Sequence, residues 1–134
     1  MVEFAKGENP LATMVQGSDG DFYGVTSGLD EVDGTILNHG TIFRMTPAGV
    51  LTTLLEFTGT EGPNLGSSPE AALVQGSDGN FYGTTPYGGA DDQGTIFRMT
   101  AEGVLTTLFE FGRNDNGSLP YAALVQGNDG DFYG

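Results

Sequence analysis

Short runs of β-branched and aromatic residues, divided by glycine-rich turn signals, make up most of this 134-residue chain. No window carries apolar residues at the i, i+3, i+4, i+7 spacing of an amphipathic helix over three turns. Runs of this kind between turn signals are typical of strands. The pattern therefore predicts an all-β protein, and within its least interrupted stretch it predicts four strands, at residues 71–75, 80–85, 94–100 and 104–111.

The third and fourth of these runs carry apolar residues on both faces of the expected strand. They are Ile96, Phe97, Met99, Val104, Leu105, Leu108, Phe109 and Phe111. A sheet with one wet face would alternate strictly between apolar and polar positions. Small antiparallel sheets covered on both faces are typical of β-propeller blades, which pack between two neighbours. The prediction is thus a set of four-stranded antiparallel propeller blades, with a β-sandwich or a β-solenoid as the open alternatives.

Turns are predicted where Asp and Gly follow each other after a short apolar run. Asp78-Gly79 lies between the first two expected strands, and Asp19-Gly20 and Asp129-Gly130 stand in the same place elsewhere. Asp-Gly is a strong signal for a type I′ hairpin, in which both central residues take positive φ angles. We therefore expect tight two-residue hairpins at these positions.

The chain repeats itself with a unit of about 51 to 59 residues. The segment 15–24 returns almost letter for letter at 74–83 and at 125–134, 40–46 returns at 94–100, and 49–54 returns at 103–108. The expected domains are a partial blade at 1–13 with a strand at 2–5, a blade at 14–70, a blade at 71–121, and the first two strands of another blade at 122–134.

Two complete blades are too few for a propeller, since propeller rings contain roughly four to eight. Exposed strand edges at both ends are templates for pairing with another chain. We therefore expect self-association, either as a ring whose end blade is completed between subunits or as an open filament. The abrupt end of the repeat also fits a fragment of a longer array.

Composition narrows the range of partners. The formal net charge is −14, from 18 acidic and 4 basic residues, which disfavours nucleic acid because its phosphates require a basic surface. There is no cysteine, so disulfides and thiolate metal sites are excluded. No apolar run reaches the length of a membrane span, and no export segment precedes the first repeat.

The repeated words, above all 71–85, 94–100 and 103–108, resemble the GloVer-type tandem repeat of bacterial surface and secreted proteins. The resemblance covers essentially the whole chain. It implies a propeller-like β structure and an extracellular or cell-surface location, and it implies no catalytic residue. The chain departs from that pattern in carrying no anchor, no export signal and no long array, and in a longer insert at 27–38, where the second unit has 86–93.

The acidic turns are candidate calcium ligands, because carboxylates two residues apart occur in calcium-binding loops. The candidates are Asp19, Asp21, Asp78, Asp129 and Asp131. The middle copy has Asn80 in place of the second Asp, and the further oxygen ligands of an EF-hand loop are missing. A structural role in the hairpin is favoured, with calcium as the alternative.

A second acidic set lies in the connection between the second and third strands of each unit. Together with one tyrosine it offers candidate ligand-binding residues for cations or glycans: Asp30, Glu31, Asp33, Tyr87, Asp91 and Asp92. Loops at one end of propeller blades commonly form the binding face. A solvated loop that keeps an acidic protein soluble is the favoured alternative. The aromatic pairs of the Phe-Tyr-Gly repeats are assigned to packing between blades, with sugar stacking as the alternative.

Arg44 and Arg98 occupy identical places in the third strand of each unit, and we assign them a structural role in which a carboxylate or carbonyl between blades anchors each guanidinium. His39 is the only histidine and has no counterpart in the second unit. No serine-nucleophile or paired-histidine motif accompanies it.

The sequence thus predicts a non-enzymatic structural and interaction module that associates with itself through its end strands. A glycan-binding or cation-binding module is the alternative. A polysaccharide hydrolase would need a non-repeated pair of acids, and only Asp30, Glu31 and Asp33 with His39 offer such asymmetry.

Overall fold

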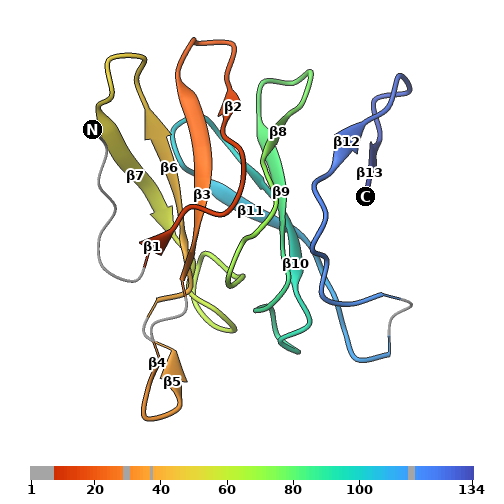
Figure 1. Ribbon diagram of the computed structural model, residues 1–134. Helices are drawn as coiled ribbons and strands as arrows, with labels where there is room; N and C mark the ends of the chain where they lie inside the picture. The colour runs from red at the N-terminus through yellow and green to blue at the C-terminus, as the bar shows by residue number, and fades with distance from the viewer. Residues whose placement is uncertain (1–7, 29–30, 37, 115–116) are drawn as a thin grey trace.

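A computed structural model describes residues 8–28, 31–36, 38–114 and 117–134, and every regular element in these ranges is a β-strand. Figure 1 shows three groups of strands that follow one another across the molecule in chain order. The all-β prediction is confirmed. The strand expected at 2–5 and the candidate ligand Asp30 lie outside the described residues. Over the described ranges, no helix has the length and hydropathy needed to cross a membrane.

The first sheet has five strands, all paired antiparallel. Its central strand, β3 (Phe22–Gly28), pairs with β6 (Thr41–Met45) on one edge, and β6 pairs with β7 (Leu51–Glu56). Two short strands share the other edge of β3, namely β1 (Glu8–Asn9) and β2 (Val15–Gln16). Four strands of the first unit, β2, β3, β6 and β7, are thus joined to β1, which precedes residue 14.

The second sheet repeats this arrangement with four strands in the order β11-β10-β9-β8. The strands are β8 (Val74–Gln75), β9 (Phe81–Thr85), β10 (Thr95–Met99) and β11 (Leu105–Glu110). These are the four strands predicted from the sequence, each shorter than expected at one or both ends. The third and fourth strands show the same register shift in both sheets, between Ile42 and Phe43 and between Ile96 and Phe97.

Among the described residues, the third group contains β12 (Val125–Gln126) and β13 (Phe132–Tyr133), the two strands that the sequence predicted there. The insert at 27–38, expected as a long connection, contains a small hairpin of β4 (Glu31–Val32) and β5 (Thr35–Ile36). This hairpin projects away from the sheets at the bottom of Figure 1.

The hairpin turns differ in type from the prediction. In the loop between β8 and β9, the Gly76 amide donates to the Asn80 carbonyl at 2.8 Å and the Gly79 amide donates to the Gly76 carbonyl at 3.0 Å. Gly79 is the residue of this loop with a positive φ, 84°, while Asp78 keeps a negative one. This is a three-residue loop that ends in a left-handed glycine, not the expected type I′ turn. A type I′ pattern does occur at Asp33-Gly34, with φ angles of 53° and 80°.

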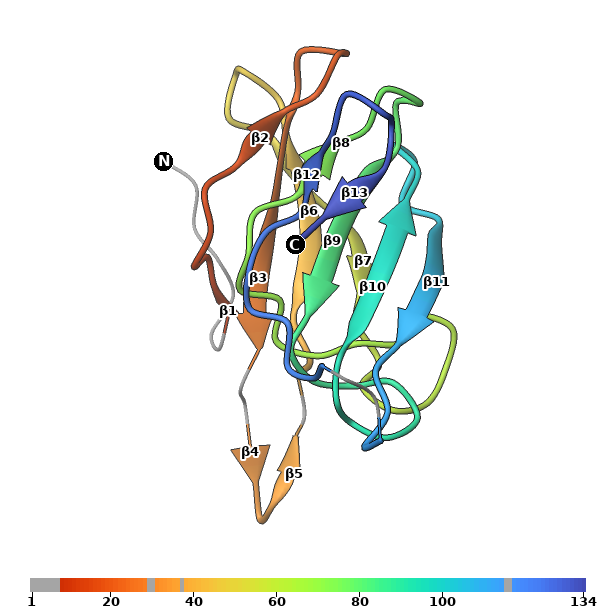
Figure 2. The ribbon, with the colours of Figure 1, turned by 90° about the vertical axis from the view of Figure 1, so that its right-hand side faces the viewer.

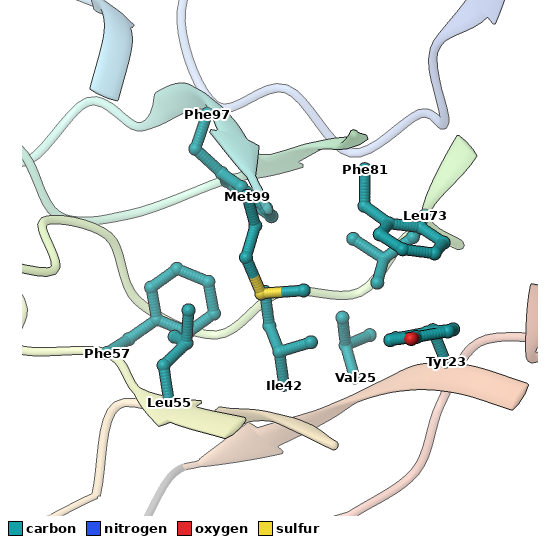
Figure 3. Close-up of a cluster of buried hydrophobic side chains, with 9 residues drawn as sticks. All are labelled: Tyr23, Val25, Ile42, Leu55, Phe57, Leu73, Phe81, Phe97 and Met99. Carbon is teal, nitrogen blue, oxygen red and sulfur yellow. The ribbon is translucent and has the colours of Figure 1, made fainter. Parts of the chain in front are cut away.

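The hydrophobic core lies between the first and second sheets, which are stacked face to face (Figure 2). Figure 3 shows its side chains converging from both sheets: Tyr23, Val25, Ile42, Leu55 and Phe57 from the first, and Leu73, Phe81, Phe97 and Met99 from the second unit. All are at most 6 % exposed. Burial of each large apolar side chain contributes roughly 1.5–3 kcal/mol, so this layer is the main source of stability.

Both faces of the outer strands were expected to be covered, and this holds only in part. Phe97 and Met99 are buried, but Val104, Leu108 and Phe109 of the second unit are exposed. Leu108 and Phe109 are exposed because, among the described strands, the far side of the second sheet meets only the short pair β12 and β13. Val104 is as exposed as its repeat counterpart Val50, at 63 % and 61 %. The structure thus shows antiparallel units of four strands that stack on one another, without closure into a ring.

Candidate functional site

The most highly repeated residues form the joint between one unit and the next. At the first joint the ring of Tyr23 packs on the ring of Phe81, with centroids 4.1 Å apart. At the second joint Tyr82 packs on Phe132 in the same way, at 4.0 Å. Offset aromatic pairs of this kind contribute about 0.5–1.5 kcal/mol beyond the area they bury. The Phe-Tyr pairs therefore serve packing between units, as the sequence indicated.

A glutamine of the following unit completes each joint. The Gln75 side chain accepts a hydrogen bond from the Ser18 backbone amide at 2.9 Å and donates to the Ser18 hydroxyl at 3.3 Å. Gln126 makes the same two bonds to Ser77, at 2.9 and 3.3 Å. Each glutamine also donates to the glycine carbonyl of its own turn. One side chain thus ties two successive hairpin turns together.

The glycine before each serine makes room for this packing. A Cβ on Gly76 would lie 2.9 Å from a ring carbon of Tyr82 and 3.1 Å from a ring carbon of Phe132. Gly17 stands in the same relation to Tyr23 and Phe81. The recurring Gln-Gly-Ser-Asp-Gly word is therefore explained by close approach at the joint.

The aspartates proposed as calcium ligands are used inside the turns. Asp19, Asp78 and Asp129 each accept a hydrogen bond from the tyrosine hydroxyl four residues later, at 2.7, 2.6 and 2.6 Å. Each also accepts the backbone amide two residues later, at 3.0–3.1 Å. Hydrogen bonds to the ionised form favour it. The tyrosine hydroxyl accordingly lowers the pKa of each of these carboxyl groups.

The tyrosines shift in the opposite direction. Burial raises the pKa of Tyr23 to about 12, and the hydrogen bond to Asp19 adds to that effect. For Tyr82 the bond to Asp78 is the largest cause of the raised pKa, with burial second. Each hydroxyl therefore stays protonated as the donor of a bond to an ionised aspartate.

The second aspartate of the turn has a different role. Asp21 forms an ion pair with Arg44, with its Oδ2 3.0 Å from the arginine Nε. The expected carboxylate partner of Arg44 is thus present, but it belongs to the same unit and does not bridge blades. In the second unit Asn80 replaces Asp21 and donates to Asp78 at 3.1 Å, while Arg98 lies close enough to Tyr82 to oppose the rise in the pKa of that hydroxyl. Asp131 is exposed at the last turn.

No metal centre is assembled among the described residues, where three or more acidic or histidine side chains nowhere gather in an arrangement that could hold an ion. Asp33 lies at the exposed tip of the β4–β5 hairpin, and Asp91 is exposed in the loop after β9. Asp92 accepts the Gly88 backbone amide at 2.7 Å, so it shapes its own loop. Tyr87 is 37 % exposed, and its hydroxyl is 2.9 Å from that of Tyr121. Glu31 lies in β4.

His39 has a partner that sequence reasoning missed. Its Nδ1 is 3.0 Å from the Oγ of Ser67, and the two residues line a hollow of about 350 Å³. Ser67 is only 3 % exposed and belongs to the segment that leads into the second unit. The pair therefore links the end of the insert to that segment. No sequence motif predicts this hydrogen bond, because the two residues come together only when the first sheet folds.

A family model described as the Gloeobacter/Verrucomicrobia repeat matches residues 1–134. None of the curated proteins searched matches the chain.

Proposed function

Since the chain belongs to the Gloeobacter/Verrucomicrobia repeat family over its whole length, we propose that it is a non-enzymatic structural and interaction module. In this proposal the units are propeller blades, and copies associate through their end strands and end faces into a ring or a filament. The family kinship is also the ground for proposing an extracellular or cell-surface location.

The observation that supports the proposal is that the joint is made twice with the same atoms. The aromatic pair is 4.1 and 4.0 Å apart at the two joints, and the glutamine-to-serine amide bond is 2.9 Å at both. A joint that forms independently of its place in the chain can also form with a unit of another chain. The side chains that recur in every unit thus serve mainly to stack units. The candidate ligand residues Asp33, Tyr87, Asp91 and Asp92 are exposed, and Asp92 also bonds within its own loop.

The edges of the sheets add a second route to association. Among the described strands, β7 and β11 end the order of the first and second sheets, so in this part of the chain each has one edge without a paired strand. Such edges pair readily with another chain. On β11 the side chains of Leu108 and Phe109 are 48 % and 47 % exposed, which adds an apolar surface to the open edge.

Molar mass in solution tests the proposal, measured by light scattering over a range of concentrations. We expect the molar mass to be a multiple of 14.0 kDa that rises with concentration and does not change when a chelator is added. Phe109→Lys should lower the mass, because it places a charge on the exposed apolar face. Thr106→Lys, an equal charge at another exposed position of β11, is the matched control. A monomer at every concentration would refute self-association.

A further inference from the structure

The second sheet presents an apolar groove whose counterpart on the first sheet is filled. A cavity of about 420 Å³ lies between the second unit, which contributes Ile96 and Phe111, and the following segment, which contributes Leu124 and Phe132. In the repeat these four residues correspond to Ile42, Phe57, Leu73 and Phe81, all members of the buried core. The groove is therefore the repeat equivalent of the buried core between the first two sheets, but some of the side chains that fill that core have no equivalent in it.

The core between the first and second sheets shows which side chains would fill the groove. There, Phe97 and Met99 of β10 lie among these residues and are fully buried. The ring of Phe97 packs edge-on against Phe57, with centroids 5.4 Å apart. The described third group holds only β12 and β13, so Phe111 has no such ring against it from that side. Phe109 shows the consequence: it is 47 % exposed, whereas Leu55, its repeat counterpart, is 6 % exposed.

A glycine marks the place of the absent ring. On Gly83 a Cβ would lie 2.6 Å from the Cζ of Phe97, and on Gly24 it would lie 2.5 Å from the Cζ of Phe43. Glycine is thus required at the position of the second strand over which the phenylalanine ring of the third strand lies. Gly134 has the same place after β13. It carries no Cβ and lines the groove, so the space for a ring is already provided.

The backbone register also fits an incoming strand. In the second sheet Met99 pairs with Phe81, Arg98 with Tyr82, and Phe97 with Gly83. The same register on β13 would place a methionine opposite Phe132, an arginine opposite Tyr133, and a phenylalanine opposite Gly134. In the described structure β13 pairs only with β12, so its other edge is available for this pairing.

We propose that the groove between the second sheet and the β12–β13 pair binds the third and fourth strands of a further copy of this same repeat, the segment equivalent to residues 94–111. The incoming strand adds to the edge of β13, and its phenylalanine and methionine fill the cavity beside Phe111 and Leu124. The inference deepens the proposed self-association and rests on it, because it names the segment by which one copy engages another. In an intact copy β10 is paired with β9 and β11 and its Phe97 and Met99 are buried, so copies engage by exchanging these two strands.

The test is a titration of the isotope-labelled chain with a synthetic peptide of residues 94–111, followed by NMR. We expect saturable shifts centred on Ile96, Phe111 and residues 132–134. A peptide carrying Phe97→Ser and Met99→Ser keeps the length and charge and should bind at least about tenfold more weakly, since tenfold corresponds to only 1.4 kcal/mol. On the chain, Gly134→Val should weaken binding of the native peptide, because its side chain occupies the place of the ring.

Absence of shifts, equal binding by the serine-substituted peptide, or shifts confined to another face would overturn the proposal. Binding of a peptide of residues 1–13 in place of the hairpin peptide would assign the groove to a different occupant and also overturn it. A second measurement uses the chain extended after Gly134 by residues 84–111: its melting temperature should rise, and the serine-substituted extension should cancel the rise.

The result is separable from that of the mass measurement. A chain that self-associates without binding the peptide keeps the proposed function and loses the groove assignment. A monomeric chain that binds the peptide keeps the groove assignment and loses self-association.

Discussion

At the scale of single residues, the repeated word Gln-Gly-Ser-Asp-Gly-x-Phe-Tyr-Gly can be explained letter by letter. The glutamine ties two turns, the first glycine admits two rings, the aspartate accepts the tyrosine hydroxyl, and the second glycine takes the positive φ. The last glycine lies under the phenylalanine of the third strand. What resembles an acidic ligand motif is thus a set of packing and hydrogen-bonding requirements.

Removal of one hydroxyl tests the importance of the tyrosine–aspartate bond. Tyr82→Phe should lower the free energy of unfolding by about 1 kcal/mol, since the ring still packs on Phe132 while the bond to Asp78 is lost. Urea denaturation measures the change. Tyr87→Phe, which removes a hydroxyl from an exposed pair, is the matched control and should change stability by less than about 0.5 kcal/mol. Equal effects of the two variants would contradict the assignment.

The same bonds predict how stability depends on pH. The pKa of Asp19 and Asp78 is lower in the folded chain than the ordinary value of 3.8. The unfolded chain therefore takes up protons first as the pH falls, so the stabilisation present above pH 3.8 is lost as the pH drops through the lowered folded values. The raised pKa of Tyr23 acts at the other end: its contribution is complete below pH 10 and is lost as the pH rises through about 12.

Thermal unfolding from pH 2 to pH 12 would show both limbs. Asp19→Asn combined with Asp78→Asn should flatten the acid limb, because an amide oxygen still accepts the hydroxyl but does not titrate. Tyr23→Phe should flatten the alkaline limb. An acid limb that is unchanged in the double variant would show that other carboxyl groups control it.

At the scale of elements, the second and third strands of each sheet pair with a phenylalanine of the third strand opposite a glycine of the second, and the ring lies over that glycine. Gly83→Ala should destabilise the protein by about 1–3 kcal/mol, because its Cβ would lie 2.6 Å from Phe97, a residue with no exposed surface to move into. Gly117→Ala is the control, since its Cβ would meet no atom closer than 3.6 Å. Chemical denaturation compares the two, and a Gly83→Ala variant as stable as the control would disprove the steric role.

At the scale of the whole molecule, the two joints are unequal because the second lacks the strands that complete the first. Local stability follows the density of buried contacts. In hydrogen exchange, the amides of β6, β9 and β10 should therefore be the slowest, and those of β12 and β13 should exchange fastest. Mass spectrometry at low protein concentration measures this difference, because association would protect the open end. Uniform protection along the chain would contradict the unequal joints.

The sequence alone was sufficient for the strands of the second unit and for the repeat, but it did not predict β1 or the β4–β5 hairpin. Apolar runs separated by glycine-rich turns predicted β8–β11 in order. Identity between segments showed which residues of the two units are equivalent. Both are local or periodic properties of the sequence. It also indicated the structural use of the Phe-Tyr pairs.

Tertiary structure decided what the polar residues do. Asp21 pairs with Arg44 inside one sheet, Gln75 reaches Ser18 across a joint, and His39 meets Ser67, each through contacts that no spacing in the sequence encodes. The turn type also escaped prediction, since Asp78 keeps a negative φ while its carboxylate holds Tyr82. A polar side chain has several possible hydrogen-bond partners in the sequence, and stacking of the sheets decides which of them lies within bonding distance.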